Sequence, residues 1–363
     1  MSNASSDAGA PRLRVSDFDY ALPPRAIAQV PAEPRDASRL LVLERARSRP
    51  GRPHLRHRTF RELGKELHAG DLLVTNDSKV MAARLAARRT TGGASEVLVL
   101  RPMSDDTSRW EALVRPSRRI AAGDRLTLPS GDVLEVGERL EDGTRAVRFF
   151  RDPAAVIAAG GEMPLPPYIR SRTSPAERYQ TVYAEPPGSA AAPTAGLHFT
   201  PELLSRLERQ GVRRAAVTLH VGLDTFRPLE GEFIEEHAIH REWYAIPPAT
   251  RRRLLAARRD GRRVIAVGTT TVRTLETHVH GGAPSGWSEL YITPPYDFRA
   301  VDALITNFHL PRSSLLLLVT AWVQAGMPGV TPFEARDTLL RAYRVALDEG
   351  YRFFSFGDAM LIV

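Results

Sequence analysis

The spacing of apolar and polar positions changes abruptly along the chain. Between residues 71 and 150, short apolar runs follow one another at close spacing, separated by turns rich in Gly, Asp, Ser and Pro. Strands are predicted over 72–75, 96–100, 110–114, 125–128, 133–136 and 146–150. Many short strands without helical patterns between them predict a small antiparallel barrel or sandwich. We interpret this stretch as an inserted β domain.

On either side of this stretch, helical and strand patterns alternate. Helices are predicted over 59–68, 201–210, 248–259, 271–278, 313–325 and 332–350. Strands are predicted over 40–43, 215–221, 264–267, 303–306 and 353–356, and 45–57, which is basic and broken by Pro and Gly, reads as a mobile turn. Such alternation indicates a sheet layered with helices.

The predicted fold class is α/β, a mixed α+β main domain with an inserted small antiparallel β-barrel. At 363 residues the chain exceeds the usual size of a single core, which favours two domains. We expect a discontinuous catalytic domain over 12–74 and 156–363, the barrel over 75–155, and a flexible tail over 1–11.

Composition narrows the class of protein. With 43% hydrophobic and 25% charged residues, the chain is typical of globular proteins. No stretch approaches the roughly 20 apolar residues that span a bilayer, and no apolar signal segment stands near Met1, so no membrane and a cytoplasmic location are predicted. The absence of Cys excludes disulfides, thiolate metal sites and a Cys nucleophile.

The charge is +8, from 50 basic and 42 acidic residues, and nearly all the basic residues are Arg. Arginine binds phosphate through a planar fork, so the excess fits a polyanionic partner. A genome that favours arginine codons explains it equally well. Lys79 and Arg84 at the start of the β stretch, and Arg115, Arg118 and Arg119 within it, could follow a nucleic-acid backbone, although charge runs are usually solvated faces.

Polar residues gather in short blocks of the C-terminal half, each beside an apolar run. These blocks are 193–200, 219–222, 267–273, 306–311 and 356–360. Loops that follow buried strands often converge on one site. His198, His220 and His309 each lie in such a block, and an imidazole can move protons near neutral pH. Three histidines in equivalent settings favour a shared cleft over isolated structural roles.

Two further patterns suit a ligand. The strand, turn and helix start around Gly268, Thr269 and Thr270 would present amides and hydroxyls to an anion, with Arg273 nearby, although ordinary helix capping by a Thr competes. Glu242 beside Trp243 suits a cationic or stacked ligand, with simple packing of the Trp as the competitor. No recognised metal motif, serine-hydrolase elbow or phosphate loop is present.

Taken together, the blocks closely resemble the S-adenosylmethionine:tRNA ribosyltransferase-isomerase family of queuosine biosynthesis. The resemblance runs from Asp17 to Ile362. It is carried by the segments 18–23, 35–40, 70–74, 177–183, 193–200, 267–273, 306–311 and 351–362. It implies a mixed α/β domain interrupted by a β-barrel, S-adenosylmethionine as co-substrate, no metal, and a tRNA carrying preQ1 as partner. The expected reaction transfers and isomerises a ribosyl group onto preQ1, giving epoxyqueuosine and releasing adenine and methionine.

The expected reaction suggests candidate roles for individual residues. We hypothesise that the catalytic residues are His198, His220, His309, Asp224 and Asp358, and that the co-substrate contacts are Gly268, Thr269, Thr270, Arg273, Glu242, Trp243 and Asn307. The tRNA contacts would be Lys79, Arg84, Arg115, Arg118 and Arg119, in a protein expected to be monomeric.

The chain departs from the family pattern at several positions. It has Ser78-Lys79 where Thr-Arg is common, Asp224 where Gly is usual, Arg241 where Ser is common before Glu242, and Pro295 where Gly is usual. A paralogue that uses the same co-substrate on another acceptor, or a tRNA-binding module without catalysis, therefore remains an alternative.

Overall fold

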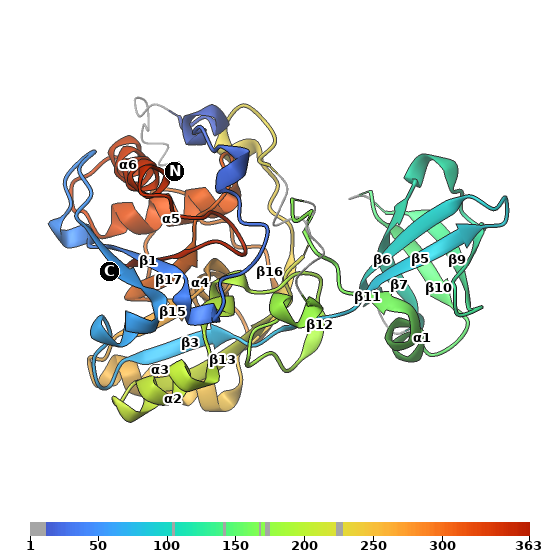
Figure 1. The fold of residues 1–363 in the computed structure, drawn as a ribbon, viewed down its shortest axis with the longest axis horizontal. Helices are drawn as coiled ribbons and strands as arrows, with labels where there is room; N and C mark the ends of the chain where they lie inside the picture. Colours follow the sequence, from blue (N-terminus) through green and yellow to red (C-terminus); the bar gives the residue numbers. More distant parts are fainter. Residues whose placement is uncertain (1–11, 104–105, 141–142, 167, 171–174, 223–227) are drawn as a thin grey trace, which may run out of the picture.

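The chain forms a large body and a small β-barrel that extends from one end of it (Figure 1). The computed structural model describes residues 12–103, 106–140, 143–166, 168–170, 175–222 and 228–363. The predicted α/β class with an inserted antiparallel barrel is confirmed. The tail predicted for 1–11 lies outside the described residues.

A nine-stranded sheet forms the centre of the large body, in the order β16-β14-β13-β3-β15-β17-β18-β1-β2. Its strands are β1 (Arg39–Leu43), β2 (Leu55–Thr59), β3 (Leu72–Asn76), β13 (Arg213–Leu219), β14 (Glu242–Ala245), β15 (Val264–Val267), β16 (Ser285–Ser288), β17 (Ala303–Asn307) and β18 (Ala359–Ile362). The four central strands β13, β3, β15 and β17 are parallel. Their carboxyl ends therefore meet at one edge, where ligands bind in open α/β sheets.

Helices cover both faces of this sheet. The helices are α2 (Pro201–Arg209), α3 (Pro248–Arg259), α4 (Thr269–Val279), α5 (Ser314–Ala325) and α6 (Pro332–Asp348). Leu72 and Val74 of β3 join the core cluster that contains side chains of α3, α4, α5 and α6, whereas Leu73 joins the cluster with α2 and the 3-10 turn Phe60–Lys65. Side chains alternate along a strand, so consecutive apolar residues of β3 serve two separate cores.

The barrel is closed by six antiparallel strands. They are β5 (Arg84–Arg89), β6 (Ala94–Met103), β7 (Asp106–Arg115), β10 (Arg145–Phe149), β9 (Val133–Arg139) and β8 (Arg125–Thr127). Closure comes from the pairs Arg88–Thr127 and Arg89–Leu126, which join β5 to β8. Helix α1 (Pro153–Gly160) and the short β11 (Gly161–Glu162) follow, and β11 still pairs with β5. The division at 75–155 stays a proposal.

The barrel and the large body meet near the outer strands of the main sheet. The short strands β4 (Lys79–Val80) and β12 (Pro187–Ser189) pair in parallel where the chain passes between the two. The Arg101 guanidinium of β6 lies 4.7 Å from the centre of the Trp287 ring of β16. Trp287 is the direct cross-strand neighbour of Trp243 in β14.

Some predicted elements were wrong. The final strand is β18, not 353–356, because Phe354 has φ of +73°, which breaks an extended run. The predicted turn 45–57 contains the start of β2, which pairs antiparallel with β1 although its middle residues are charged, because strand pairing joins backbone groups. The helix predicted over 59–68 is a shorter 3-10 turn. Strands β5, β14 and β16 were not predicted.

No helix among the described residues is long and apolar enough to cross a membrane.

Leu304 tests the packing of the central sheet. It is fully buried in β17, so Leu304→Ala is expected to lower the free energy of unfolding by about 2–5 kcal/mol through reduced burial and a cavity. Leu255→Ala, the same change at a side chain that is 71% exposed on α3, should stay within about 0.5 kcal/mol of wild type. Chemical denaturation of both variants measures this. Equal losses would contradict the packing described.

Candidate functional site

Asn76 holds the carboxyl ends of the central strands together. Its side-chain amide donates to the Leu219 carbonyl oxygen (2.9 Å) and to the Thr270 hydroxyl (3.2 Å). Its side-chain oxygen accepts from the Leu219 amide (3.0 Å) and the Ser78 amide (3.1 Å). One buried side chain therefore ties β3, β13, the first turn of α4 and the segment that leads to the barrel. Sequence reasoning gave Asn76 no place in the site.

Helix α4 begins at this edge without a side-chain cap. Gly268 precedes it with φ of +90°, a conformation that favours glycine, and no side chain in the part of the chain that the structure describes accepts from the first-turn amides. The Thr269 or Thr270 capping alternative is therefore not adopted. A small cavity of about 40 Å³ adjoins this turn, lined by Thr269, Thr270 and Arg273 together with residues of β14, α5 and the segment 290–292. An uncapped helix start beside a cavity suits an anionic group.

Glu242 and Arg273 form a buried ion pair beside this cavity. Their side chains are 3% and 9% exposed, and the guanidinium nitrogen lies 2.6 Å from the carboxylate oxygen. Arg273 also donates to the carbonyl oxygens of His240 (2.7 Å) and Ser288 (3.0 Å). Burial alone raises the pKa of Glu242, but the Arg273 charge, His240 and the Gly222 amide outweigh it and lower the pKa to about 2. Glu242 is therefore ionised throughout the neutral range.

The Gly222 amide connects this pair to the end of β13. It donates to the second Glu242 oxygen at 3.0 Å, and His240 Nε2 lies 3.3 Å from the same oxygen. The site therefore includes His240, which was not among the site residues predicted from the sequence. Among the described residues, no group of His, Asp and Glu has the arrangement of a metal site.

His220 lies between Trp243 and Gly188. Its ring stacks on the Trp243 ring with centroids 5.2 Å apart and planes 17° from parallel. A Cβ at Gly188 would come within 2.7 Å of the His220 ring, so the glycine backbone packs directly against the imidazole. Burial lowers the pKa of His220, and its buried Nδ1 has no hydrogen-bond partner among the described residues. A neutral, half-buried imidazole with spare bonding capacity can accept a proton.

His198 is buried and hydrogen-bonded through both ring nitrogens. Its Nδ1 is 2.8 Å from the Ser38 hydroxyl and its Nε2 is 3.2 Å from the Asn307 amide nitrogen. Asn307 in turn accepts from the Thr194 hydroxyl at 2.9 Å. Burial, with the charges of Arg352 and Arg35, lowers the pKa of His198 to about 3. His198 and Asn307 therefore belong to an uncharged hydrogen-bond network at the 3-10 turn Thr194–His198.

His309 and Asp358 make contacts that fix the backbone. His309 Nε2 is 2.9 Å from the Thr306 hydroxyl, and burial lowers its pKa to about 3. Asp358 accepts from the backbone amides of Arg39 (2.9 Å) and Arg352 (2.8 Å). Neither group is among the residues that line the cavity beside α4. Their catalytic roles stay predictions, and Asp224 lies outside the described residues.

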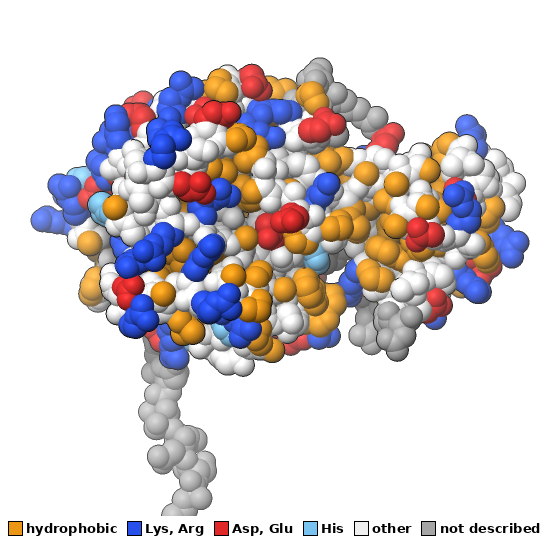
Figure 2. Space-filling model, turned by 90° about the horizontal axis from the view of Figure 1, so that it is seen from below, with side chains coloured by type: hydrophobic (Ala, Val, Ile, Leu, Met, Phe, Trp, Pro, Cys, Tyr) orange, Lys and Arg blue, Asp and Glu red, His pale blue; other side chains and the backbone are white. Residues whose placement is uncertain are grey.

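The candidate RNA contacts lie on and beside the barrel. Lys79, Arg115, Arg118 and Arg119 are exposed, whereas Arg84 is half-buried and pairs with Glu96 at 3.5 Å. Lys79 is the strand partner of Pro187, next to the glycine that covers His220. Figure 2 shows basic side chains over both the barrel and the large body, interspersed with acidic ones. The RNA contacts also stay predictions.

Comparison with known proteins gives one consistent result. A family model described as queuosine biosynthesis protein matches residues 15–362. An S-adenosylmethionine:tRNA ribosyltransferase-isomerase of Moorella thermoacetica is 51% identical, covering 97% of this chain and all of that protein. The protein of the same name from Thermotoga maritima is 49% identical over the same shares. A crystal structure of S-adenosylmethionine tRNA ribosyltransferase from Thermotoga maritima matches 96% of this chain at 40% identity and a TM-score of 0.53.

The buried ion pair generates a stability prediction. Removing the charge with Glu242→Gln leaves Arg273 buried and uncompensated, so the free energy of unfolding should fall by about 3–5 kcal/mol at neutral pH. Glu232→Gln, in an exposed pair with Arg14, should cost no more than about 1 kcal/mol. Denaturant unfolding at pH 7 compares the two.

The same pair predicts a pH dependence. The pKa of Glu242 is lowered in the folded state from an ordinary 4.5 to about 2, so its contribution is complete above pH 4.5 and is lost as the pH falls from 4.5 toward 2. Unfolding measured between pH 6 and pH 3 should show a shallower acid loss for Glu242→Gln than for wild type. Parallel curves would contradict the assignment.

Proposed function

This chain belongs to the S-adenosylmethionine:tRNA ribosyltransferase-isomerase family of queuosine biosynthesis, and on that premise we propose that its acceptor is preQ1 in tRNA. The chain is a transferase and isomerase that uses S-adenosylmethionine as co-substrate and tRNA as partner. The ribosyl part of the co-substrate passes to the aminomethyl group of preQ1, is isomerised to give epoxyqueuosine, and adenine and methionine depart. The match along nearly the whole chain carries this proposal, despite the altered positions Lys79, Asp224, Arg241 and Pro295.

We propose His220 as the base that starts the reaction. A sulfonium acidifies the adjoining C5′ carbon, and the step needs a neutral base at the open edge of the sheet. His220 is half-buried with a lowered pKa, while His198 and His309 are enclosed by existing hydrogen bonds. Its stacking on Trp243 fixes the plane of the ring. These differences favour His220 over the other two histidines.

We propose that the start of α4 holds the methionine carboxylate of the co-substrate. Uncapped first-turn amides, together with the Thr269 and Thr270 hydroxyls, would donate hydrogen bonds to a carboxylate at the adjoining cavity. Glu242 is already neutralised by Arg273, so it acts less as a lone counter-charge than as the group that positions the Gly222 amide and His240. Trp243 offers the aromatic face nearest to the proposed base.

A cytoplasmic location and a monomeric state complete the proposal. The tRNA partner supports the first.

Adenine release tests the function. The protein is incubated with S-adenosylmethionine and preQ1-tRNA, with unmodified tRNA, or with no RNA, and adenine and the modified nucleoside are followed by mass spectrometry. We expect adenine and epoxyqueuosine only with preQ1-tRNA. Adenine release without tRNA would indicate a small acceptor, and salt-sensitive tRNA binding without any release would indicate a binding module; both outcomes contradict the proposal.

The base assignment predicts a kinetic signature. His220→Gln should lower kcat by roughly 10²–10⁴-fold, whereas His68→Gln, at an exposed histidine outside the site, should not. Because the pKa of His220 is lowered from 6.5, the neutral base persists as the pH falls, so the acid limb of kcat/KM in wild type should lie below pH 6.5. Full turnover in His220→Gln would overturn the assignment, and the parallel variants His198→Gln and His309→Gln would then be compared.

A further inference from the structure

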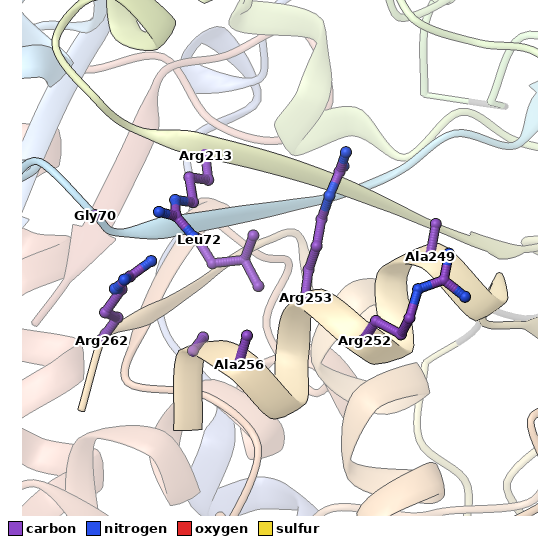
Figure 3. Close-up of a pocket in the computed structure, with 9 residues that line it drawn as sticks. Gly70, Leu72, Arg213, Ala249, Arg252, Arg253, Ala256 and Arg262 are labelled. Carbon is purple, nitrogen blue, oxygen red and sulfur yellow. The ribbon is translucent and has the colours of Figure 1, made fainter. Parts of the chain in front are cut away.

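An arginine-lined hollow of about 250 Å³ lies between α3 and the amino-terminal ends of β3 and β13 (Figure 3). We call it the α3 hollow. Arg252 and Arg253 reach it from the helix, Arg213 from the start of β13, and Arg262 from the turn before β15. Its remaining lining is glycine and apolar side chains, and no Asp or Glu is among the residues that line it. Like charges have therefore been gathered around a concave surface with an apolar floor.

The carboxylates nearest to the α3 hollow are already engaged. Asp71, which precedes Leu72 in the floor, is 4% exposed and pairs with Arg263 at 2.5 Å. Asp260 pairs with Arg262 at 2.8 Å and also with Arg259. Among the described residues, Arg213 and Arg252 have no carboxylate within 4.0 Å, although Asp260 still attracts Arg213 from a longer distance. With four arginines in its lining and one of them paired with Asp260, the α3 hollow keeps a net positive charge.

Two of its four arginines are held in place before any ligand binds. Arg253 donates to the Arg214 carbonyl oxygen at 2.5 Å, on the side of β13 that lacks a strand neighbour there. The stem of Arg262 rests on Gly70, whose φ is +94° and where a Cβ would stand 3.4 Å from the Arg262 Cδ. Arginines fixed in this way lose less conformational entropy when they bind a ligand.

The chemistry of the hollow fits phosphate groups. Guanidinium groups bind phosphate oxygens through paired N–H donors, and several around one concavity suit a chain of phosphates more than a single carboxylate. Figure 2 looks onto the side where α2 and α3 lie and shows basic side chains gathered there on the large body. An extended polyanion could therefore lie along this side.

We infer that the α3 hollow binds backbone phosphates of the tRNA substrate, as a second contact separate from the barrel. This inference rests on the proposed function for the identity of the RNA. The hollow lies at the amino-terminal end of β13, whereas His220 follows its carboxyl end; seven residues at about 3.3 Å each put roughly 20 Å between them. A folded tRNA is long enough to place a modified base at the site and a phosphate run at the hollow.

The test compares two double variants with equal loss of charge. Arg213→Gln/Arg252→Gln removes two arginines of the hollow whose side chains make no hydrogen bond or close ion pair with the described residues. Arg341→Gln/Arg344→Gln removes two exposed arginines of α6, which lies at the far end of the large body from α3 (Figure 1). Dissociation constants for preQ1-tRNA are measured by filter binding across a series of salt concentrations, after melting curves show that both variants fold like wild type.

The hollow variant should bind tRNA roughly tenfold more weakly, and the slope of log affinity against log salt should fall by about two, one for each phosphate that no longer meets an arginine. The α6 variant should keep the wild-type slope. Wild-type slope in the hollow variant, or an equal weakening in both, would overturn the inference. Binding is measured without turnover, so a failure of the proposed reaction would appear separately as absent adenine release by wild type.

Discussion

The open edge of the main sheet depends on how Asn76 satisfies backbone groups at the strand ends. Parallel strands that stop together leave amides and carbonyls that water or a side chain must bond. Asn76 bonds both the amide and the carbonyl of Leu219 and also reaches Thr270. Without these hydrogen bonds, the side chain of Asn76 would not fix the end of β13 relative to the start of α4, and the positions of the nearby site residues would be less well defined.

Charge burial is the second constraint on the site. Glu242 and Arg273 are both removed from water, which is costly unless each finds several partners. Here the carboxylate is also bonded by Gly222, and the guanidinium by two carbonyl groups. The pair thereby joins β14, α4 and the end of β13, and it acts as a framework as much as a source of charge.

The sequence predicted elements whose apolar runs are continuous and clearly bounded. The strands predicted over 264–267 and 303–306 correspond to β15 and β17, and the helix over 248–259 has the bounds of α3. Strand β14 was not predicted because it contains Glu242. This charged residue is buried in the strand because it pairs with Arg273, 31 residues further along the chain. The strand predicted over 353–356 was wrong. Its aromatic residues are typical of strands, and nothing in the sequence indicates that Phe354 has a left-handed backbone conformation.

The histidines show the same limit at the level of the site. Their sequence settings are alike, yet the Phe60 ring lies 5.0 Å from the His198 ring, whereas the His220 ring packs against Trp243 and the glycine backbone of Gly188. Which imidazole stays accessible depends on distant segments that cover it. The spacing of residues along the chain does not show which segments cover each histidine. The sequence blocks therefore predicted a site but not which of its histidines is accessible.

The side of β13 beside α3 has a consequence for how this protein behaves among other chains. The free backbone groups of an unpaired strand edge can hydrogen-bond to a strand of another molecule, which is a common route to aggregation. Here the outward carbonyls of Arg214 and Ala216 are occupied by the side chains of Arg253 and Thr250. Helix α3 thus blocks this part of the β13 edge against pairing with another strand, and Arg253 takes part in that protection as well as in the lining of the α3 hollow.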